Sequence, residues 1–172
     1  MKETLAIIFN TRPILEKDIL VEMFTKDLGR IHAFAKFAQS NKPRFGGLLN
    51  TFNCVKVGVL ERNGSFTLRH IQRVDTFQYL KKNYTALSTA YNMLDIVRAV
   101  TQLNIENEGL FTILNDALSH INSVKNQTDV LQIFYYAILK NEGLVTSAMN
   151  LNEMDYKKMI ESYSGIKLKD KL

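Results

Sequence analysis

The chain is poor in the residues that form cross-links and metal sites. Its 172 residues include one cysteine, two prolines, three histidines and no tryptophan. Because Cys54 has no second cysteine to pair with, the sequence excludes an intrachain disulfide and a zinc site built from several cysteines. The histidines, His32, His70 and His120, are far apart in the sequence. We therefore expect no bound metal and no other cofactor.

Long hydrophobic runs and common catalytic motifs are also missing. No run approaches the roughly 18 apolar residues of a membrane-spanning helix, and the opening stretch, MKETLAIIFNTR, has no small-residue site for signal-peptide cleavage. The motifs GxxxxGKS/T, GxGxxG, GxSxG and HExxH do not occur. Cys54 lies in the strand-like stretch NCVKVGVL, which favours a buried thiol over a nucleophile. We expect a cytoplasmic protein that is not an enzyme.

Positive charge is concentrated in the first part of the chain. Residues 1–77 contain 12 Lys and Arg against 7 Asp and Glu, a net charge of +5, whereas residues 78–172 contain 10 of each sign. This asymmetry favours a polyanionic partner, nucleic acid before membrane, because no basic amphipathic helix accompanies it. The same charge can also serve solubility alone.

The first 77 residues have the pattern of short strands joined by turns, with no helix between them. The predicted strands cover residues 4–12, 18–25, 31–38, 51–62 and 66–74. Five antiparallel strands in so short a length favour a closed barrel of the OB type over an open sheet, which would leave long edges exposed. A five-stranded SH3-like barrel is the alternative.

Alternation is clearest in IHAFAKFA, residues 31–38. One predicted face points inward and consists of Ile31, Ala33, Ala35 and Phe37. The other predicted face points to solvent and consists of His32, Phe34 and Lys36. A cation and an aromatic ring are therefore expected side by side on the outside of the barrel.

The second part of the chain changes to a helical period. Apolar residues recur at helical spacing in four segments, residues 79–104, 110–124, 129–143 and 152–164. We expect a cap at Thr128 or Asp129, an end at Gly143 and a cap at Asn152. The predicted fold is thus α+β in two parts that share an interface.

The two predicted domains are an OB-fold nucleic-acid-binding domain, residues 1–77, and a helical bundle, residues 78–172. Between residues 26 and 44 the first domain has five cations and one acid, Asp27. Cations can neutralise phosphates and exposed rings can stack on bases. Phe45 is included because it lies in a polar loop, whereas Phe52 is expected in the core. The candidate binding residues are Lys26, Arg30, Phe34, Lys36, Lys42, Arg44 and Phe45.

Three stretches of this region resemble the N-terminal domain of RecO, a family of bacterial recombination mediators. They read ExDxLVxxFTxxLGR over residues 16–30, AxAK over residues 33–36, and KxRxGGxLxxF over residues 42–52. The similarity is best over residues 5–75 and continues more weakly to residue 145.

The resemblance implies an OB-fold followed by a helical domain, in a nucleoid-associated protein of recombinational DNA repair. It implies binding to single- and double-stranded DNA, annealing of complementary strands, and help in loading the recombinase onto strands coated by single-strand-binding protein. The implied partners are RecR and the acidic C-terminal tail of the coating protein. That tail would bind the helical domain, where Lys81, Lys82 and Arg98 are the candidate contacts.

The sequence also departs from the family pattern. Many members have a four-cysteine zinc module in the helical part, which Cys54 alone cannot form, so the chain resembles a short form without it. Phe37 stands where a glycine is expected after the A-K pair. Two other classes remain open: a protein-interaction adaptor whose charge serves solubility, and an RNA-binding OB module.

Overall fold

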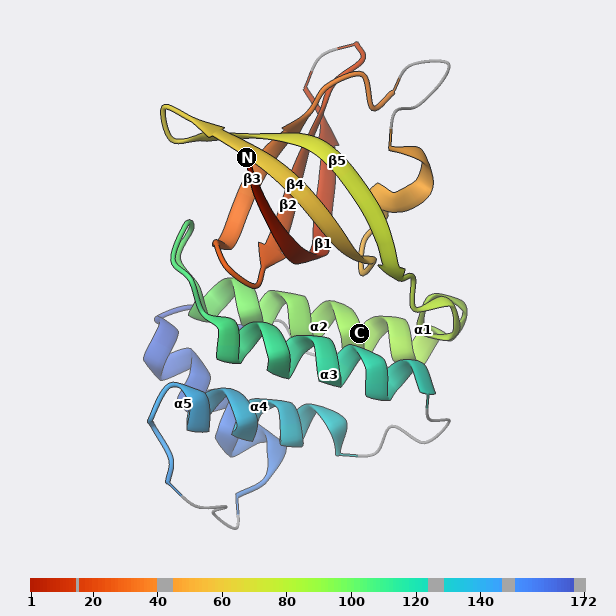
Figure 1. Cartoon of the computed structure of the whole chain (residues 1–172). Coiled ribbons are helices and arrows are strands. Elements are labelled where there is room, and N and C mark those ends of the chain that lie inside the picture. Colours follow the sequence, from red (N-terminus) through yellow and green to blue (C-terminus); the bar gives the residue numbers. More distant parts are fainter. Residues whose placement is uncertain (15, 40–44, 124–128, 147–150, 169–172) are drawn as a thin grey trace. The chain divides into compact units, whose positions relative to one another are not determined.

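The computed structural model (Figure 1) describes residues 1–14, 16–39, 45–123, 129–146 and 151–168. These residues form two units. The first comprises Met1–Thr76 and Gln102–Glu108, and the second comprises Phe77–Thr101 and Gly109–Leu172. Within the described ranges, none of the helices has the length and apolarity that crossing a membrane requires.

The first unit is a closed barrel of five strands. The strands are β1 (Lys2–Pro13), β2 (Ile19–Thr25), β3 (Gly29–Ala35), β4 (Cys54–Arg62) and β5 (Ser65–Asp75), with a 3-10 turn, η1, at Gly46–Leu49. Their order around the barrel is β1-β2-β3-β5-β4. All pairs are antiparallel except β3 and β5, which pair in parallel and close the barrel. The predicted five-stranded barrel is confirmed.

Alternation along the strands fills the barrel core. In β3, Ile31, Ala33 and Ala35 are fully buried, because successive side chains of a strand point to opposite faces. Valines and other aliphatic residues of the remaining strands complete the cluster. Phe45 and Leu49, at the start and end of the η1 region, belong to the same core.

The end of β3 differs from the prediction. The strand ends at Ala35, and Phe37 lies in the following turn with a φ of 61° and 57% of its surface exposed. The expectation that Phe37 points into the core is therefore wrong. The reason is the left-handed backbone conformation, which breaks the alternation that a strand would continue.

A short segment distant in sequence, residues 102–108, completes the barrel unit. The backbone N–H of Asn104 donates to the carbonyl of Arg30 at 2.9 Å. Gly29 has a φ of 67°, and a Cβ there would overlap the carbonyl of Ile105. Glycine is thus required at this position both by the backbone conformation and by the close approach of the segment.

The second unit contains the helices. They are α1 (Gln78–Lys82), α2 (Tyr84–Val100), α3 (Glu108–Ser123), α4 (Val130–Asn141) and α5 (Glu153–Ser164). A helical part after the barrel is confirmed. The single helix expected over residues 79–104 is instead α1 and α2. The break occurs at Asn83, which has an extended ψ of 119° and caps α2 by accepting from the N–H of Ala86 at 2.9 Å.

The helix ends agree in part with the sequence signals. Asn152 caps α5 in a capping box with Asp155, as predicted for Asn152. Gly143 follows the end of α4 with a φ of 73°. Asp129 precedes α4, but its side chain makes no capping hydrogen bond; Thr128 lies outside the described residues.

Candidate nucleic-acid interface

The outward side of β1, β2 and β3 carries exposed cationic and aromatic side chains. The strand register pairs Arg12 of β1 with Leu20 of β2, and Leu20 with Phe34 of β3. The neighbouring row consists of Asn10, Glu22 and His32. Residues in register on neighbouring strands point to the same face of a sheet. A guanidinium, an imidazole and an aromatic ring therefore share one surface, which we call the cationic face.

A depression of about 180 Å³ lies in this face. Its walls are Asn10, Arg12, Leu20, Glu22 and His32. Arg12 and His32 are exposed, whereas Leu20 and Glu22 are half-buried. The depression is thus lined by an arginine, a histidine and an amide together with the carboxylate of Glu22 and the side chain of Leu20.

The exposed side of β3 has the composition that the sequence predicts. His32, Phe34 and Lys36 are exposed, and Phe34 shows 38% of its surface. A ring at this position offers one side to a base. Lys36 directly follows the end of β3, in a turn, and is exposed.

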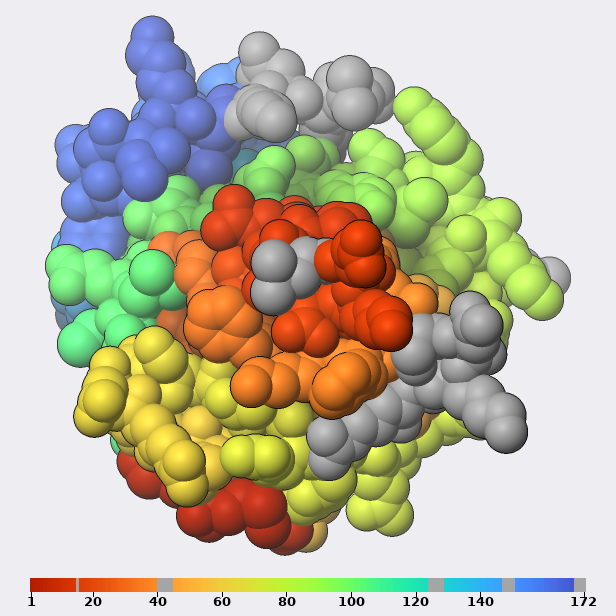
Figure 2. All heavy atoms as spheres, turned by 90° about the horizontal axis from the view of Figure 1, so that it is seen from above, coloured from red at the N-terminus to blue at the C-terminus, as the bar shows by residue number. Residues whose placement is uncertain are grey.

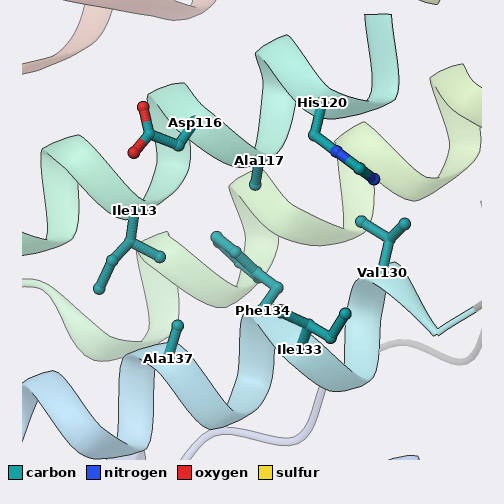
Figure 3. Close-up of a pocket in the computed structure, with 8 residues that line it drawn as sticks. All are labelled: Ile113, Asp116, Ala117, His120, Val130, Ile133, Phe134 and Ala137. Atoms are coloured by element: carbon teal, nitrogen blue, oxygen red, sulfur yellow. The ribbon is translucent and has the colours of Figure 1, made fainter. Parts of the chain in front are cut away.

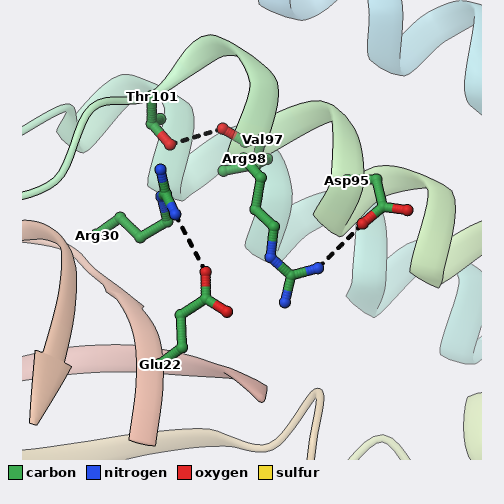
Figure 4. Close-up of polar contacts among 6 residues, drawn as sticks. All are labelled: Glu22, Arg30, Asp95, Val97, Arg98 and Thr101. Atoms are coloured by element: carbon green, nitrogen blue, oxygen red, sulfur yellow. Dashed lines mark hydrogen bonds and ion pairs between the residues drawn. The ribbon is translucent and has the colours of Figure 1, made fainter. Parts of the chain in front are cut away.

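Two of the predicted cations already have acidic partners inside the barrel unit. Arg30 Nη1 lies 3.2 Å from Glu22 Oε1 (Figure 4), and both side chains are mostly buried. Lys26 Nζ lies 3.0 Å from Glu108 Oε1, and this hydrogen bond raises the pKa of Lys26. Their charges are partly neutralised, so they contribute less positive potential than their number implies.

Of the remaining candidates, Lys42, Arg44 and Phe45, only Phe45 lies within the described residues, and its environment differs from the one expected. Phe45 is only 3% exposed and packs in the barrel core. The expectation of an exposed ring at Phe45 is wrong, because an apolar ring next to the barrel gains more from burial than from solvent. Lys42 and Arg44 lie outside the described residues, so their roles stay predictions.

The turn after β3 is held by the chain that follows β1. The backbone N–H of Phe37 donates to Asp18 Oδ1 at 2.9 Å, and that of Gln39 donates to the carbonyl of Lys17 at 3.1 Å. Seen from above, the red chain after β1 and the orange chain after β3 lie side by side at one end of the barrel (Figure 2). This end adjoins the cationic face at Arg12 and Phe34.

Arg12 is a candidate that the sequence reasoning missed. It lies outside the cluster of cations between residues 26 and 44, and only the strand register places it in line with Phe34. The available signal was its position near the end of the first strand, one residue before Pro13. That signal does not reveal which strand lies beside it.

The three candidates for peptide binding do not gather at one place. Lys81 and Lys82 end α1, whereas Arg98 is in the last turn of α2. At about 1.5 Å per residue, a helix of this length separates its ends by about 25 Å. Arg98 Nη1 is also paired with Asp95 Oδ1 at 3.0 Å (Figure 4). In the same part of α2, the hydroxyl of Thr101 donates to the carbonyl of Val97.

The helical unit has an apolar groove of about 400 Å³ between α3 and α4 (Figure 3). Its lining residues are Ile113, Asp116, Ala117, His120, Val130, Ile133, Phe134 and Ala137. None of the predicted peptide contacts lines it. Among the described residues, the polar side chains that line this groove are Asp116 and His120, and none is a lysine or arginine of the kind expected for an acidic tail.

The described residues contain no group of three or more His, Cys, Asp or Glu side chains placed to hold a metal ion. Cys54 is buried, as expected for a strand thiol. Burial raises the pKa of the Cys54 thiol to about 11, and the nearby charge of Asp75 adds to this. A thiol that stays protonated at neutral pH is a poor nucleophile.

These features define the class of the first unit. A closed five-stranded barrel in which β3 and β5 pair in parallel, with a cationic and aromatic outer face on β1, β2 and β3, is an OB-type barrel. It is followed by a helical unit.

Comparison with known proteins gives the family resemblance. Residues 1–79 match the family described as Recombination protein O N terminal. The chain is 26% identical over 172 residues to DNA repair protein RecO of Enterococcus faecalis, covering 95% of this chain and 64% of that protein. The RecO proteins of Caldanaerobacter subterraneus (23% identical, 77% of this chain, 54% of that protein) and Myxococcus xanthus (26%, 81% and 58%) are also similar.

The chain thus resembles DNA repair protein RecO, as the sequence stretches predict. It spans between about half and two thirds of the length of these relatives.

Proposed function

We propose that this chain binds DNA through the cationic face and takes part in recombinational DNA repair. In this proposal it binds single- and double-stranded DNA, anneals complementary strands, and helps to load the recombinase onto strands coated by single-strand-binding protein. The similar proteins are named DNA repair proteins. Binding and annealing DNA in this way would require no reaction catalysed by the chain itself.

One observation carries the proposal: Arg12, Leu20 and Phe34 form a row across three strands, beside His32. Single strands bind OB barrels by laying the backbone along cations while bases stack on exposed rings. Arg12 and Lys36 flank the exposed ring of Phe34 with positive charge, and both are exposed. Lys26 and Arg30 also belong to the proposed surface, but their acidic partners, Glu108 and Glu22, reduce the positive potential that they contribute.

The proposed mechanism of annealing is passive. A basic surface screens the repulsion between two phosphate backbones, and releases counterions as each strand binds. Two strands held on one protein have a high local concentration, so base pairing then drives them together. No nucleotide hydrolysis is required.

Two partners complete the proposal, RecR and the acidic C-terminal tail of single-strand-binding protein. For the tail we propose contacts on the helical unit at Lys81 and Lys82, with Arg98 as a separate contact at the other end of α2. Because these sites are about 25 Å apart, one short tail would use one of them. A labelled peptide with an acidic, apolar end tests which site is used. Weaker binding by Lys81→Glu with Lys82→Glu alone assigns the tail to α1, weaker binding by Arg98→Glu alone assigns it to the end of α2, and unchanged binding by both variants contradicts the proposal.

The DNA proposal is tested by fluorescence anisotropy with a labelled single-stranded oligonucleotide across a salt series. The test variant is Arg12→Glu with Lys36→Glu. The matched control is Lys140→Glu with Lys158→Glu, which makes the same change in net charge on exposed residues of α4 and α5. Circular dichroism checks that both variants stay folded.

We expect steep salt dependence for the native chain and the control. In the test variant, Arg12→Glu with Lys36→Glu, the loss of two phosphate contacts should reduce the slope of log Kobs against log salt by about 1.4 for a single strand. If the test variant binds DNA as tightly as the control variant, the cationic face is not the DNA-binding site. Negligible binding by the native chain at low salt would favour a protein-interaction adaptor, and preference for matched RNA in competition would favour an RNA-binding module.

A further inference from the structure

Phe37 combines two features that are unfavourable for an isolated protein. Its φ of 61° lies in the left-handed region, where a bulky side chain is strained. Its side chain is also 57% exposed. Two other phenylalanines in the described residues, Phe52 and Phe77, share a positive φ, but both are 1% exposed, so burial of the ring offsets their strain.

The turn holds Phe37 in place from outside β3. Asp18 Oδ1 accepts from the Phe37 N–H at 2.9 Å, and the carbonyl of Lys17 accepts from Gln39 at 3.1 Å. These bonds tie the turn to the segment before β2. These backbone hydrogen bonds hold the turn in the conformation that gives Phe37 its positive φ. Glycine would adopt it at lower cost.

The neighbours of Phe37 have the chemistry of a nucleic-acid surface. Phe34 precedes it by three residues, so the two Cα atoms are at most about 10 Å apart. Lys36 lies between them in sequence and is exposed. Two exposed rings and a cation within that distance can serve successive nucleotides of one strand.

We propose that Phe37 is a second base-stacking ring, which together with Phe34 makes the cationic face bind single-stranded nucleic acid in preference to duplex. This inference rests on the proposed function and adds a residue and a strand preference to it. The bases of a single strand are free to stack on a ring, whereas those of a duplex are already stacked and paired. The strained conformation is retained because it presents the ring to the bases.

Tryptophan fluorescence gives a direct test, because the chain has no tryptophan of its own. Phe37→Trp places one indole in the turn, and Tyr84→Trp places one at an exposed position of α2 as the control. Stacking on a base quenches indole emission. We expect saturable quenching by a single-stranded oligonucleotide for Phe37→Trp, and none for Tyr84→Trp.

Substitution by glycine separates binding from folding. Phe37→Gly should weaken single-strand binding by about 5-fold or more, as expected for the loss of one stacked ring at 1 to 3 kcal/mol. Duplex binding should change less than twofold, and the unfolding temperature should not fall, because glycine relieves the strained φ. Phe37→Tyr keeps the ring and should bind single strands as the native chain does.

The outcomes distinguish this inference from the proposed function. If the native chain binds with a steep salt slope but Phe37→Gly binds equally well and Phe37→Trp is not quenched, Phe37 has no stacking role and the cationic face stands. Equal losses for single strand and duplex would also overturn the inference. If the native chain binds no nucleic acid, both proposals fail. Should Phe37→Gly not fold, quenching or its absence in Phe37→Trp still decides.

Discussion

Replacing Gly29 by alanine should destabilise the barrel unit more than replacing other glycines of this chain. The residue begins β3 with a φ of 67°, and an added Cβ would overlap the carbonyl of Ile105. The overlapping atom is backbone, so it cannot rotate away as a side chain would. Relief requires residues 102–108 to move off the strand.

The magnitude has two parts. Placing alanine in the left-handed region costs about 1 to 2 kcal/mol. Moving the segment away breaks the hydrogen bond from Asn104 N–H to the Arg30 carbonyl, which contributes about 1 kcal/mol. We expect a total loss of about 2 to 4 kcal/mol.

Two other glycines provide matched controls. Gly64 has a φ of 74° and nothing within 4 Å of an added Cβ, so Gly64→Ala carries the conformational cost alone. Gly47 has no positive φ and only an ordinary contact with Asn50, at 3.7 Å, so Gly47→Ala should be neutral or slightly stabilising.

Urea unfolding followed by circular dichroism measures the three variants. With a slope of about 2 kcal/mol per molar urea, the loss at Gly29 should lower the midpoint by about 1 to 2 M. The order of stability should be Gly47→Ala, then Gly64→Ala, then Gly29→Ala. If Gly29→Ala is no less stable than Gly64→Ala, residues 102–108 do not lie against Gly29 in solution.

Three further results are expected. Burial raises the pKa of Cys54 from 9.0 to about 11, so above pH 9 the unfolded state loses the thiol proton while the folded state keeps it. The free energy of unfolding should therefore fall by about 2 to 3 kcal/mol between pH 9 and 11. Urea titrations at several pH values measure this loss, which should be smaller for Cys54→Ala. Asn152→Ala removes the cap of α5 and should cost about 1 kcal/mol, seen as faster amide exchange there. Leu114 of α3 is fully buried, so Leu114→Ala should lower the free energy of unfolding by about 2 to 5 kcal/mol in thermal unfolding. Ile133 is 64% exposed, so Ile133→Ala should lower it by less than about 0.5 kcal/mol.

The barrel is predictable from the sequence because its signals are local. In residues 31–35 a period of two separates the buried from the exposed side chains, and the structure buries Ile31, Ala33 and Ala35. The turns between strands are also marked by glycine, as at Gly29 and Gly64. Each of these signals depends on neighbours within a few residues.

The features that sequence reasoning missed depend on distant partners. Phe45 looked exposed because its neighbours in sequence are polar, but its place in the core is set by residues of other strands. Phe37 continues the alternation of β3 in sequence, and only the bond to Asp18 and a positive φ turn it outward. No periodic pattern connects Arg12 to Phe34, because that pairing passes through β2.

The helices show the same division. Periodicity indicated the helical segments, but not the break at Asn83, since the apolar stripe continues across it while the backbone becomes extended. An asparagine there is compatible with a helix interior and with a cap. The choice is made by the side chain, which accepts from Ala86 N–H.

The division of the barrel unit between residues 1–76 and residues 102–108 affects the order in which it forms during synthesis. All five strands have been made once Asp75 leaves the ribosome, so the barrel can close at that stage. The segment that reaches Gly29 and Arg30 follows roughly 30 residues later, which at about 5 to 20 residues per second is a delay on the order of seconds. During this interval the start of β3 is uncovered, and a polypeptide cut just after β5 would keep it so permanently.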